Sequence, residues 1–205
     1  ATVTSNAILN AANQALSAAG ADLSKLPVAV QPEIATADKA TQELDVDVVV
    51  VGAGGAGMTA AINATQAGKN VLIVEKMPYA GGNSTKATGG MNAAGTKYQA
   101  EIEFTNAKGV ENTLATAAEK WADNETITNL AATVQAQWDA YQANPQGYFD
   151  TPELMALDTM IGGKGINDPA LVKTLTEQSA AGIDWLDSIG APLPKLAFSG
   201  GASVS

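Results

Sequence analysis

The residues with the clearest chemical meaning are Gly52 to Gly57, with the sequence GAGGAG. They follow directly on an apolar run. They contain the pattern Gly-x-Gly-x-x-Gly, in which each glycine has its own physical reason. Gly52 permits a tight turn, Gly54 lets the backbone come close to a pyrophosphate, and Gly57 allows a helix to pack closely on a strand. The N-terminus of that helix presents free N–H groups and a partial positive charge to phosphates. The spacing therefore predicts a dinucleotide site that needs no basic side chain.

The elements that must position these glycines lie on either side of them. Val46 to Val51 is a continuous branched run, typical of a strand buried on both faces of a parallel sheet. Ala56 to Ala67 favours a helix with Gly68 as its left-handed cap, and Val71 to Val74 is a second apolar run. The helix residues expected to face the core are Met58, Ala61, Ile62 and Thr65. This order predicts an α/β fold, a Rossmann-like domain with a parallel sheet.

An acidic residue closes this unit. Glu75 ends the second strand, 18 residues after Gly57. A carboxylate at that place accepts hydrogen bonds from the adenosine ribose hydroxyls, and its charge would repel a 2′-phosphate, so NADP is disfavoured. The alternative that these residues leave open is a structural glycine turn that binds nothing.

The composition limits the remaining chemistry. The net charge is −10, every one of the 11 basic residues is a lysine, and there is no histidine or cysteine. Such acidity argues against a nucleic-acid partner, whose binding depends on clustered basic side chains. Without cysteine the chain lacks a thiol nucleophile, and without histidine it lacks the commonest general base. Without arginine it lacks the side chain that binds carboxylates through two hydrogen bonds. No apolar run reaches the roughly 20 residues of a spanning helix, so no transmembrane segment is expected.

A second glycine-rich segment follows, from Met77 to Ala94. It contains two glycine pairs, Gly81-Gly82 and Gly89-Gly90, with small hydroxyl and amide residues between them. This pattern favours a backbone that lies close against a large flat ligand. A nicotinamide enzyme would usually continue with further βαβ units, and an ordinary flexible loop is the other interpretation.

At this point the residues carry a resemblance. Val48 to Ala94, with GAGGAG, VEK, GGNS and GGMNAA, resembles the FAD-binding region of the soluble fumarate reductase flavoproteins and their relatives that reduce urocanate and similar unsaturated acids. Thr151 to Ser203 resembles the helical stretch that follows in that family. The resemblance implies FAD as cofactor, and hydride transfer from reduced FAD to the activated C=C bond of a small unsaturated acid. It also implies an electron-donor domain or protein as a partner.

The resemblance also implies which residues contact the cofactor. Ala56 and Glu75 would contact the FAD phosphates and ribose, and Asn83 and Ser84 the middle of FAD. The glycine pair Gly89-Gly90 would contact the flavin end. The full expected set is Gly52, Gly54, Gly55, Ala56, Gly57, Glu75, Lys76, Gly82, Asn83, Ser84, Thr88, Gly89 and Gly90. Gly90 and Met91 would border the substrate pocket, whereas Lys86 is either part of this loop site or a solvated surface lysine.

The family places its proton-donating arginine and its carboxylate-binding Arg and His groups elsewhere, and none can be in this chain. We therefore expect no catalytic residue here, and a fragment that is inactive alone. A non-catalytic flavin-binding or electron-relay module is the competing hypothesis, and a NAD-linked dehydrogenase fragment is disfavoured by the segment after Glu75.

The first 20 residues are similar to the end of small FMN-binding domains, in which a Ser-Gly-Ala-Thr motif carries FMN on its threonine. Thr2 would then bear covalent FMN in the parent protein, although Thr4 or Ser5 as a helix cap is the alternative. Residues 21–44 are expected to be a linker, and residues 45–205 the N-terminal part of an FAD-binding domain with a helical insertion at 98–150. Such an order favours an extracytoplasmic or cell-surface location over a cytoplasmic one.

Helical patterns are expected in the second half of the chain. Val110 to Trp121 and Glu125 to Tyr141 have helical periodicity, and their apolar residues are expected to form a core rather than a cofactor box. Capping residues before prolines at Thr151-Pro152 and Asp168-Pro169 predict two further helices, packed on the nucleotide-binding sheet. The first is predicted to end near Gly162-Gly163, and the second near Gly182 or, alternatively, near Gly190. The lone acids Asp158 and Asp184 lack the clustered spacing of a metal site, so no metal is expected.

Overall fold

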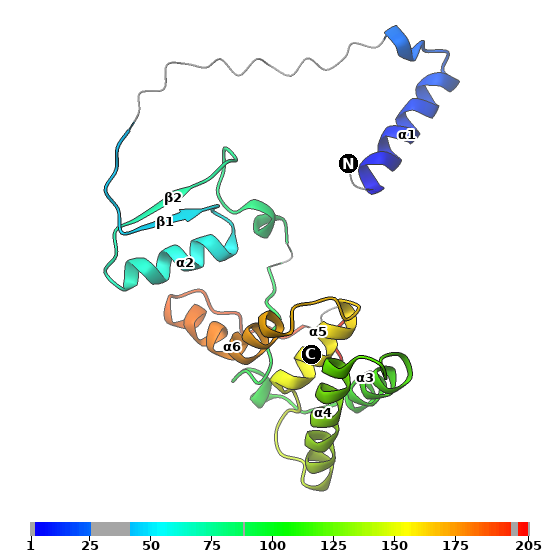
Figure 1. The fold of residues 1–205 in the computed structure, drawn as a ribbon, viewed down its shortest axis with the longest axis vertical. Helices are drawn as coiled ribbons and strands as arrows, with labels where there is room; N and C mark the ends of the chain where they lie inside the picture. Colours follow the sequence, from blue (N-terminus) through cyan, green and yellow to red (C-terminus); the bar gives the residue numbers. More distant parts are fainter. Residues whose placement is uncertain (1–2, 26–41, 88, 198–200, 205) are drawn as a thin grey trace. The chain divides into compact units, whose positions relative to one another are not determined.

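The structure is a computed structural model that describes residues 3–25, 42–87, 89–197 and 201–204 (Figure 1). The chain divides into two compact units, Ala1–Asp47 and Val48–Ser205. The first contains the helix α1, Val3–Ala18, and a 3-10 turn, Leu23–Lys25. Thr2 and residues 26–41 of the expected linker lie outside the described residues, so the FMN assignment and the domain boundaries stay predictions.

The second unit begins with the predicted strand, glycine turn, helix and strand. β1, Val48–Val51, and β2, Val71–Val74, pair in parallel with Val48 opposite Val71. The crossover between them is α2, Gly55–Gln66. Gly68 ends the crossover with φ +77°, and its N–H donates to the Thr65 carbonyl. The order of elements and the left-handed glycine cap are confirmed, although β1 begins two residues later than the apolar run.

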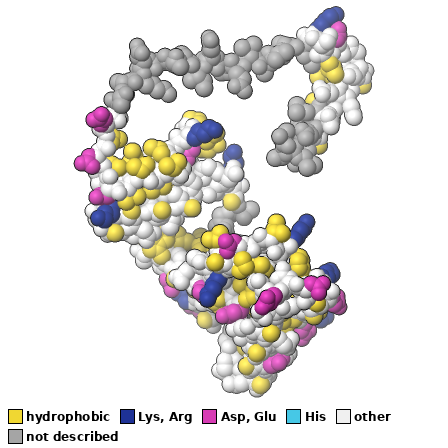
Figure 2. Space-filling model, in the orientation of Figure 1, with side chains coloured by type: hydrophobic (Ala, Val, Ile, Leu, Met, Phe, Trp, Pro, Cys, Tyr) yellow, Lys and Arg dark blue, Asp and Glu magenta, His cyan; other side chains and the backbone are white. Residues whose placement is uncertain are grey.

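The prediction that this strand is buried on both faces is wrong for the structure described. Val50 is 8% exposed, whereas Val49 is 55% and Val51 83% exposed. α2 packs on both strands from one side, and apolar side chains gather over β1 and β2 in Figure 2. Of the four helix residues expected in the core only Ala61 is buried, whereas Met58, Ile62 and Thr65 are exposed. A two-stranded sheet with one covering helix has too little surface to enclose every branched side chain.

The rest of the second unit is a helical body. It consists of α3, Ala107–Lys120, α4, Glu125–Ala143, α5, Pro152–Gly162, and α6, Pro169–Ser188. In Figure 1 α4 lies beside α3 and α5, and α5 packs in turn on α6. The helices predicted over residues 110–121 and 125–141 are confirmed. Their apolar face is core, because Val134 and Trp138 are buried, and Leu130 and Trp121 pack against the same cluster. None of the helices in the described ranges combines the length and apolar character that a bilayer crossing needs.

The last two helices start as predicted. The Thr151 hydroxyl accepts from the Leu154 N–H at 3.1 Å, and the Asp168 carboxylate accepts from the Ala170 N–H at 2.8 Å. α6 continues to Ser188, which matches the longer of the two predicted ends. The expectation that these helices pack on the nucleotide-binding sheet is wrong. Instead, α5 packs on α3 and α4, and α6 packs on α5.

Candidate cofactor site

The glycine turn between β1 and α2 has a different constraint at each glycine. Gly52 has φ +100°, which favours glycine, and its N–H donates to the Val74 carbonyl at 2.7 Å. A Cβ at Gly57 would lie 1.9 Å from the Gly52 carbonyl oxygen, so only glycine lets α2 approach β1. At Gly54, in contrast, no described atom lies within 4 Å of a Cβ position. Folding explains two of the three glycines, and the third faces open space.

Glu75 lies across from this turn. Its carboxylate accepts the Ala53 N–H at 2.7 Å and the Met77 N–H at 2.8 Å. The N–H groups of Met77 and then of Ala53 lower the pKa of Glu75 below its ordinary value. The side chain is therefore ionised at neutral pH and holds the segment after β2 beside the glycine turn.

The second glycine segment folds back onto the first. The Gly81 N–H donates to the Ala53 carbonyl at 2.6 Å, and Gly54 and Gly81 form a parallel bridge. A 3-10 turn, Gly82–Lys86, then brings the Ser84 hydroxyl to the Gly55 N–H at 3.1 Å. Segments that are nearly 30 residues apart in the chain therefore meet at the N-terminus of α2.

The first turn of α2 has the donors that a phosphate requires. Met58 is the first residue whose N–H bonds to a carbonyl of the turn, that of Gly54 at 2.9 Å. The N–H groups of Ala56 and Gly57 precede it and have no carbonyl partner within the helix. They lie at the positive end of the helix dipole, next to the open side of Gly54. These residues fit a dinucleotide pyrophosphate, with Glu75 close enough to the turn to face the adjoining ribose.

The predicted cofactor residues fall into two groups in the structure. The first surrounds the glycine turn and contains Gly52, Gly54, Gly55, Ala56, Gly57, Glu75, Lys76, Gly82, Asn83 and Ser84. The second consists of Gly89 and Gly90, which line a hollow in the helical body together with Met91. Lys86 is exposed at the end of its 3-10 turn, and Thr88 lies outside the described residues. The contacts of all these residues with a cofactor stay predictions.

The hollow has a volume of about 820 Å³. Besides the glycine pair, its lining comes from the segment 91–99, from Asp150 and α5, from α6, and from the segments 192–197 and 201–204. Two carboxylates lie in its wall, those of Asp150 and Asp158. Sequence reasoning considered Asp158 only as a metal ligand and overlooked Asp150, because no residue near either one in the chain signals their burial. No group of three or more acidic side chains that could hold a metal occurs in the part of the chain that the structure describes.

Asp150 has the most perturbed carboxyl group of this wall. Burial raises its pKa to about 7, and the charge of Asp158 adds to the effect. A hydrogen bond from Gln99 Nε2 at 2.5 Å and one from the Gly95 N–H oppose the rise. Burial also raises the pKa of Asp158, whose hydrogen bonds from Ser203 and Thr113 offset part of that rise. The hollow thus has a wall whose charge changes with pH.

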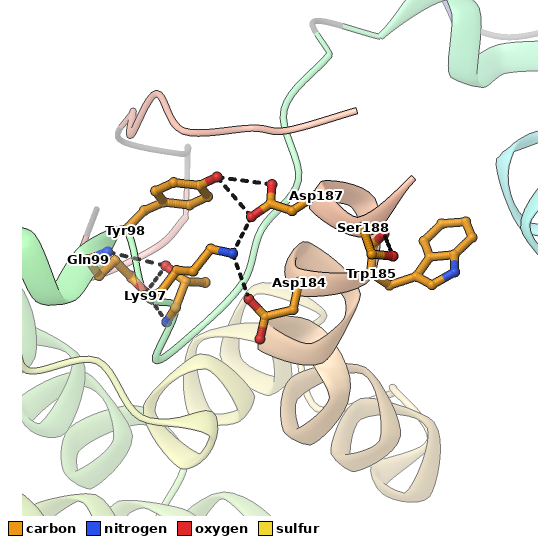
Figure 3. A network of polar contacts seen from close by, with 8 residues as sticks. Lys97, Tyr98, Gln99, Asp184, Trp185, Asp187 and Ser188 are labelled. Atoms are coloured by element: carbon orange, nitrogen blue, oxygen red, sulfur yellow. Dashed lines mark hydrogen bonds and ion pairs between the residues drawn. The ribbon is translucent and has the colours of Figure 1, made fainter. Parts of the chain in front are cut away.

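A polar network holds the segment that leads from Met91 into the helical body (Figure 3). Lys97 forms ion pairs with Asp187 and, at 3.2 Å, with Asp184, both on α6. The Tyr98 hydroxyl donates to the Asp187 carboxylate at 2.9 Å. Lys97 lowers the pKa of Asp187, and Asp187 in turn raises the pKa of Lys97. These contacts tie one side of the hollow to α6.

Comparison with known proteins agrees with this geometry. Residues 47–144 match the family described as FAD binding domain. The cytochrome-type fumarate reductase of Shewanella frigidimarina is 39% identical over 160 residues, which are 78% of this chain and 20% of the relative. This chain is a relative of the fumarate reductase flavoproteins. The resemblance inferred from GAGGAG, VEK, GGNS and GGMNAA is thereby confirmed, and so is the predicted fold class.

Two further matches extend the relationship to other reductases and to a solved structure. The urocanate reductase of Eggerthella lenta is 32% identical over 211 residues, which cover 100% of this chain and 26% of that relative. A structure of the open conformation of a flavocytochrome c3 fumarate reductase is 37% identical, with a TM-score of 0.51 over 77% of this chain and 20% of the other. The chain thus spans about a fifth to a quarter of the length of these relatives.

Proposed function

We propose that this chain binds FAD at the glycine turn and supplies the FAD-binding portion of a flavin-dependent reductase. The observation that carries the proposal is the open side of Gly54, next to the N–H groups of Ala56 and Gly57 that have no carbonyl partner within α2, and across from the ionised Glu75. A turn that served folding alone would need Gly52 and Gly57 but not a glycine at position 54.

Each part of the site has a distinct task in this proposal. The N–H groups of Ala56 and Gly57 bind the pyrophosphate, and the Glu75 carboxylate accepts hydrogen bonds from the ribose hydroxyls. Gly89 and Gly90 leave room for the flavin end at the hollow. FAD supplies the hydride chemistry that the protein side chains cannot perform. The residues of this chain bind and orient FAD.

The reaction we propose for the whole protein is hydride transfer to the activated C=C bond of a small unsaturated carboxylic acid. The support is the similarity to reductases of fumarate and urocanate. The sequence contains no histidine and no arginine to bind carboxylates or donate the proton. The groups that complete catalysis therefore come from outside this sequence, and the chain by itself is proposed to be inactive.

Two finer parts of the proposal concern electron supply. Covalent FMN on Thr2 of the parent protein would pass electrons towards FAD, and a donor domain or protein would reduce the FMN. A surface or extracytoplasmic location would suit such an arrangement. The second candidate function is a non-catalytic electron relay, which a complete parent sequence without arginine and histidine in its remaining part would favour. Mass measurement of the denatured chain tests the first point, because covalent FMN adds its mass to the peptide that contains Thr2.

Titration of the purified chain with FAD and with ADP tests the binding proposal. The unaltered chain is expected to bind both ligands, because ADP contains the adenosine and pyrophosphate that the glycine turn recognises. Gly54→Ala is expected to lower the affinity for both by roughly tenfold or more, since the methyl group fills the ligand's space. The same variant is expected to unfold at an unchanged temperature because its Cβ meets no described atom. Equal affinity of the Gly54→Ala and unaltered chains, or no binding by either, would refute the proposal.

A further inference from the structure

One carboxylate, that of Asp158, bonds the segment 201–204 to the helical body. The Ser203 N–H and hydroxyl both donate to Oδ2 of Asp158 in α5, each at 2.7 Å. The other oxygen of Asp158 accepts from the Thr113 hydroxyl of α3 at 3.0 Å. One side chain thus joins two helices and a segment that lies 45 residues further along the chain.

A glycine of α3 makes this approach possible. A Cβ at Gly109 would lie 1.8 Å from the Ser203 carbonyl oxygen and 2.9 Å from its carbonyl carbon. These are backbone atoms, so any larger residue at position 109 would displace the segment. Ser203 and Val204 are 7% and 6% exposed, and Val204 is part of the hydrophobic core. The segment has one tightly determined place on the helical body.

The position of the segment 201–204 determines the shape of the hollow. Gly201, Ala202 and Val204 line it, as do Gly89 and Gly90 at the expected flavin end of the cofactor. The polar groups of Ser203 bond to Asp158, so the segment presents mainly backbone and small apolar side chains to the hollow. Such a surface suits a flat ring system, which packs by area rather than by hydrogen bonds.

We propose that Asp158 is a positioning residue for FAD: through Ser203 it fixes the wall of the hollow against which the flavin end of the cofactor lies. The inference rests on the proposed function, because FAD must bind at the glycine turn for its flavin end to reach this wall. It assigns Asp158 no contact with the cofactor. The carboxylate acts only through the segment that it holds.

The test compares FAD with ADP, which lacks the flavin, on the 205-residue chain. Asp158→Asn removes the charge that Ser203 and Thr113 donate to, and Gly109→Ala displaces Ser203 without changing any charge. Each variant is expected to bind FAD roughly tenfold more weakly and ADP as before, because only the flavin end of FAD lies against the displaced wall. The visible absorption band of bound FAD is expected to shift as well. Asp123→Asn, at an exposed position before α4 that does not line the hollow, is the matched control and should change neither affinity.

The outcomes separate this inference from the proposal it rests on. FAD affinity within about twofold of the unaltered chain in both variants would overturn the inference and leave FAD binding standing. An equal loss of FAD and ADP affinity would also overturn it, because that result indicates general damage to the fold. If the unaltered chain binds neither ligand, the proposed function fails and the inference fails with it. Should Gly109→Ala unfold, as circular dichroism would show, Asp158→Asn alone decides.

Discussion

Replacing Asp150 by asparagine should change the pH dependence of the free energy of unfolding. The side chain lies in the wall of the hollow, and its burial raises the pKa to about 7 from an ordinary value of 3.8. Asparagine has nearly the same shape and still accepts the hydrogen bond from Gln99 Nε2. The substitution therefore removes the charge and little else.

The sign of the pH dependence follows from the direction in which the pKa of Asp150 is shifted. Between pH 3.8 and about 7 the folded chain keeps a proton on Asp150 that the unfolded chain has lost. The contribution of Asp150 to the free energy of unfolding therefore falls as the pH rises through that window, and it is constant above about pH 7. Each pH unit is worth about 1.4 kcal/mol, so the full cost at pH 8 is roughly 4 kcal/mol as an upper bound. The nearby charge of Asp158 contributes to that cost and would be relieved as well.

The assay is urea unfolding followed by tryptophan fluorescence at pH values from 5 to 8. Asp150→Asn is expected to gain stability relative to the unaltered chain as pH rises. The gain between pH 5 and pH 8 should approach roughly 3 kcal/mol, because about two pH units of the window lie in that range. Asp123→Asn, at an exposed position before α4, is the matched control for the loss of one carboxylate.

One result would refute this reasoning. If the difference in unfolding free energy between Asp150→Asn and the unaltered chain is the same at pH 5 and pH 8, Asp150 titrates alike in the folded and unfolded states. Burial in the wall of the hollow would then have no effect on its ionisation.

Three further predictions concern the glycine turn and the network on α6. Gly57→Ala should lower the free energy of unfolding by about 1–3 kcal/mol, because its Cβ would lie 1.9 Å from the Gly52 carbonyl oxygen; thermal unfolding measures this, and unchanged stability would contradict the close packing. Glu75→Gln should bind ADP more weakly and discriminate less against ADP that carries a 2′-phosphate; equal discrimination by both chains in titrations would exclude a role for the charge. Asp187→Asn removes the ion pair with Lys97 and should speed amide exchange in residues 94–98; unchanged exchange would mean that the network does not hold this segment.

Much of the glycine-turn unit could be predicted because its signals are local. The branched runs, the glycine spacing and Glu75 all lie within residues 46–75, and the structure has each in its expected order. Helix starts at Thr151 and Asp168 were predictable for the same reason, since a capping side chain bonds to an N–H two or three residues away. Burial of the β1 valines was not, because it depends on what covers the sheet.

The sequence by itself determined where the glycine turn, its strands, its acid and the helix caps lie, and through them the relationship to FAD-binding reductases. Only the tertiary structure decided that Asp150 and Asp158 face one hollow, and that Ser203 reaches Asp158 past Gly109. The physical reason is that hydrogen-bond spacing and backbone conformation are short-range properties of neighbouring residues. Burial, the pKa shifts it causes and the shape of a cavity are sums over atoms from distant segments, and no local pattern encodes them.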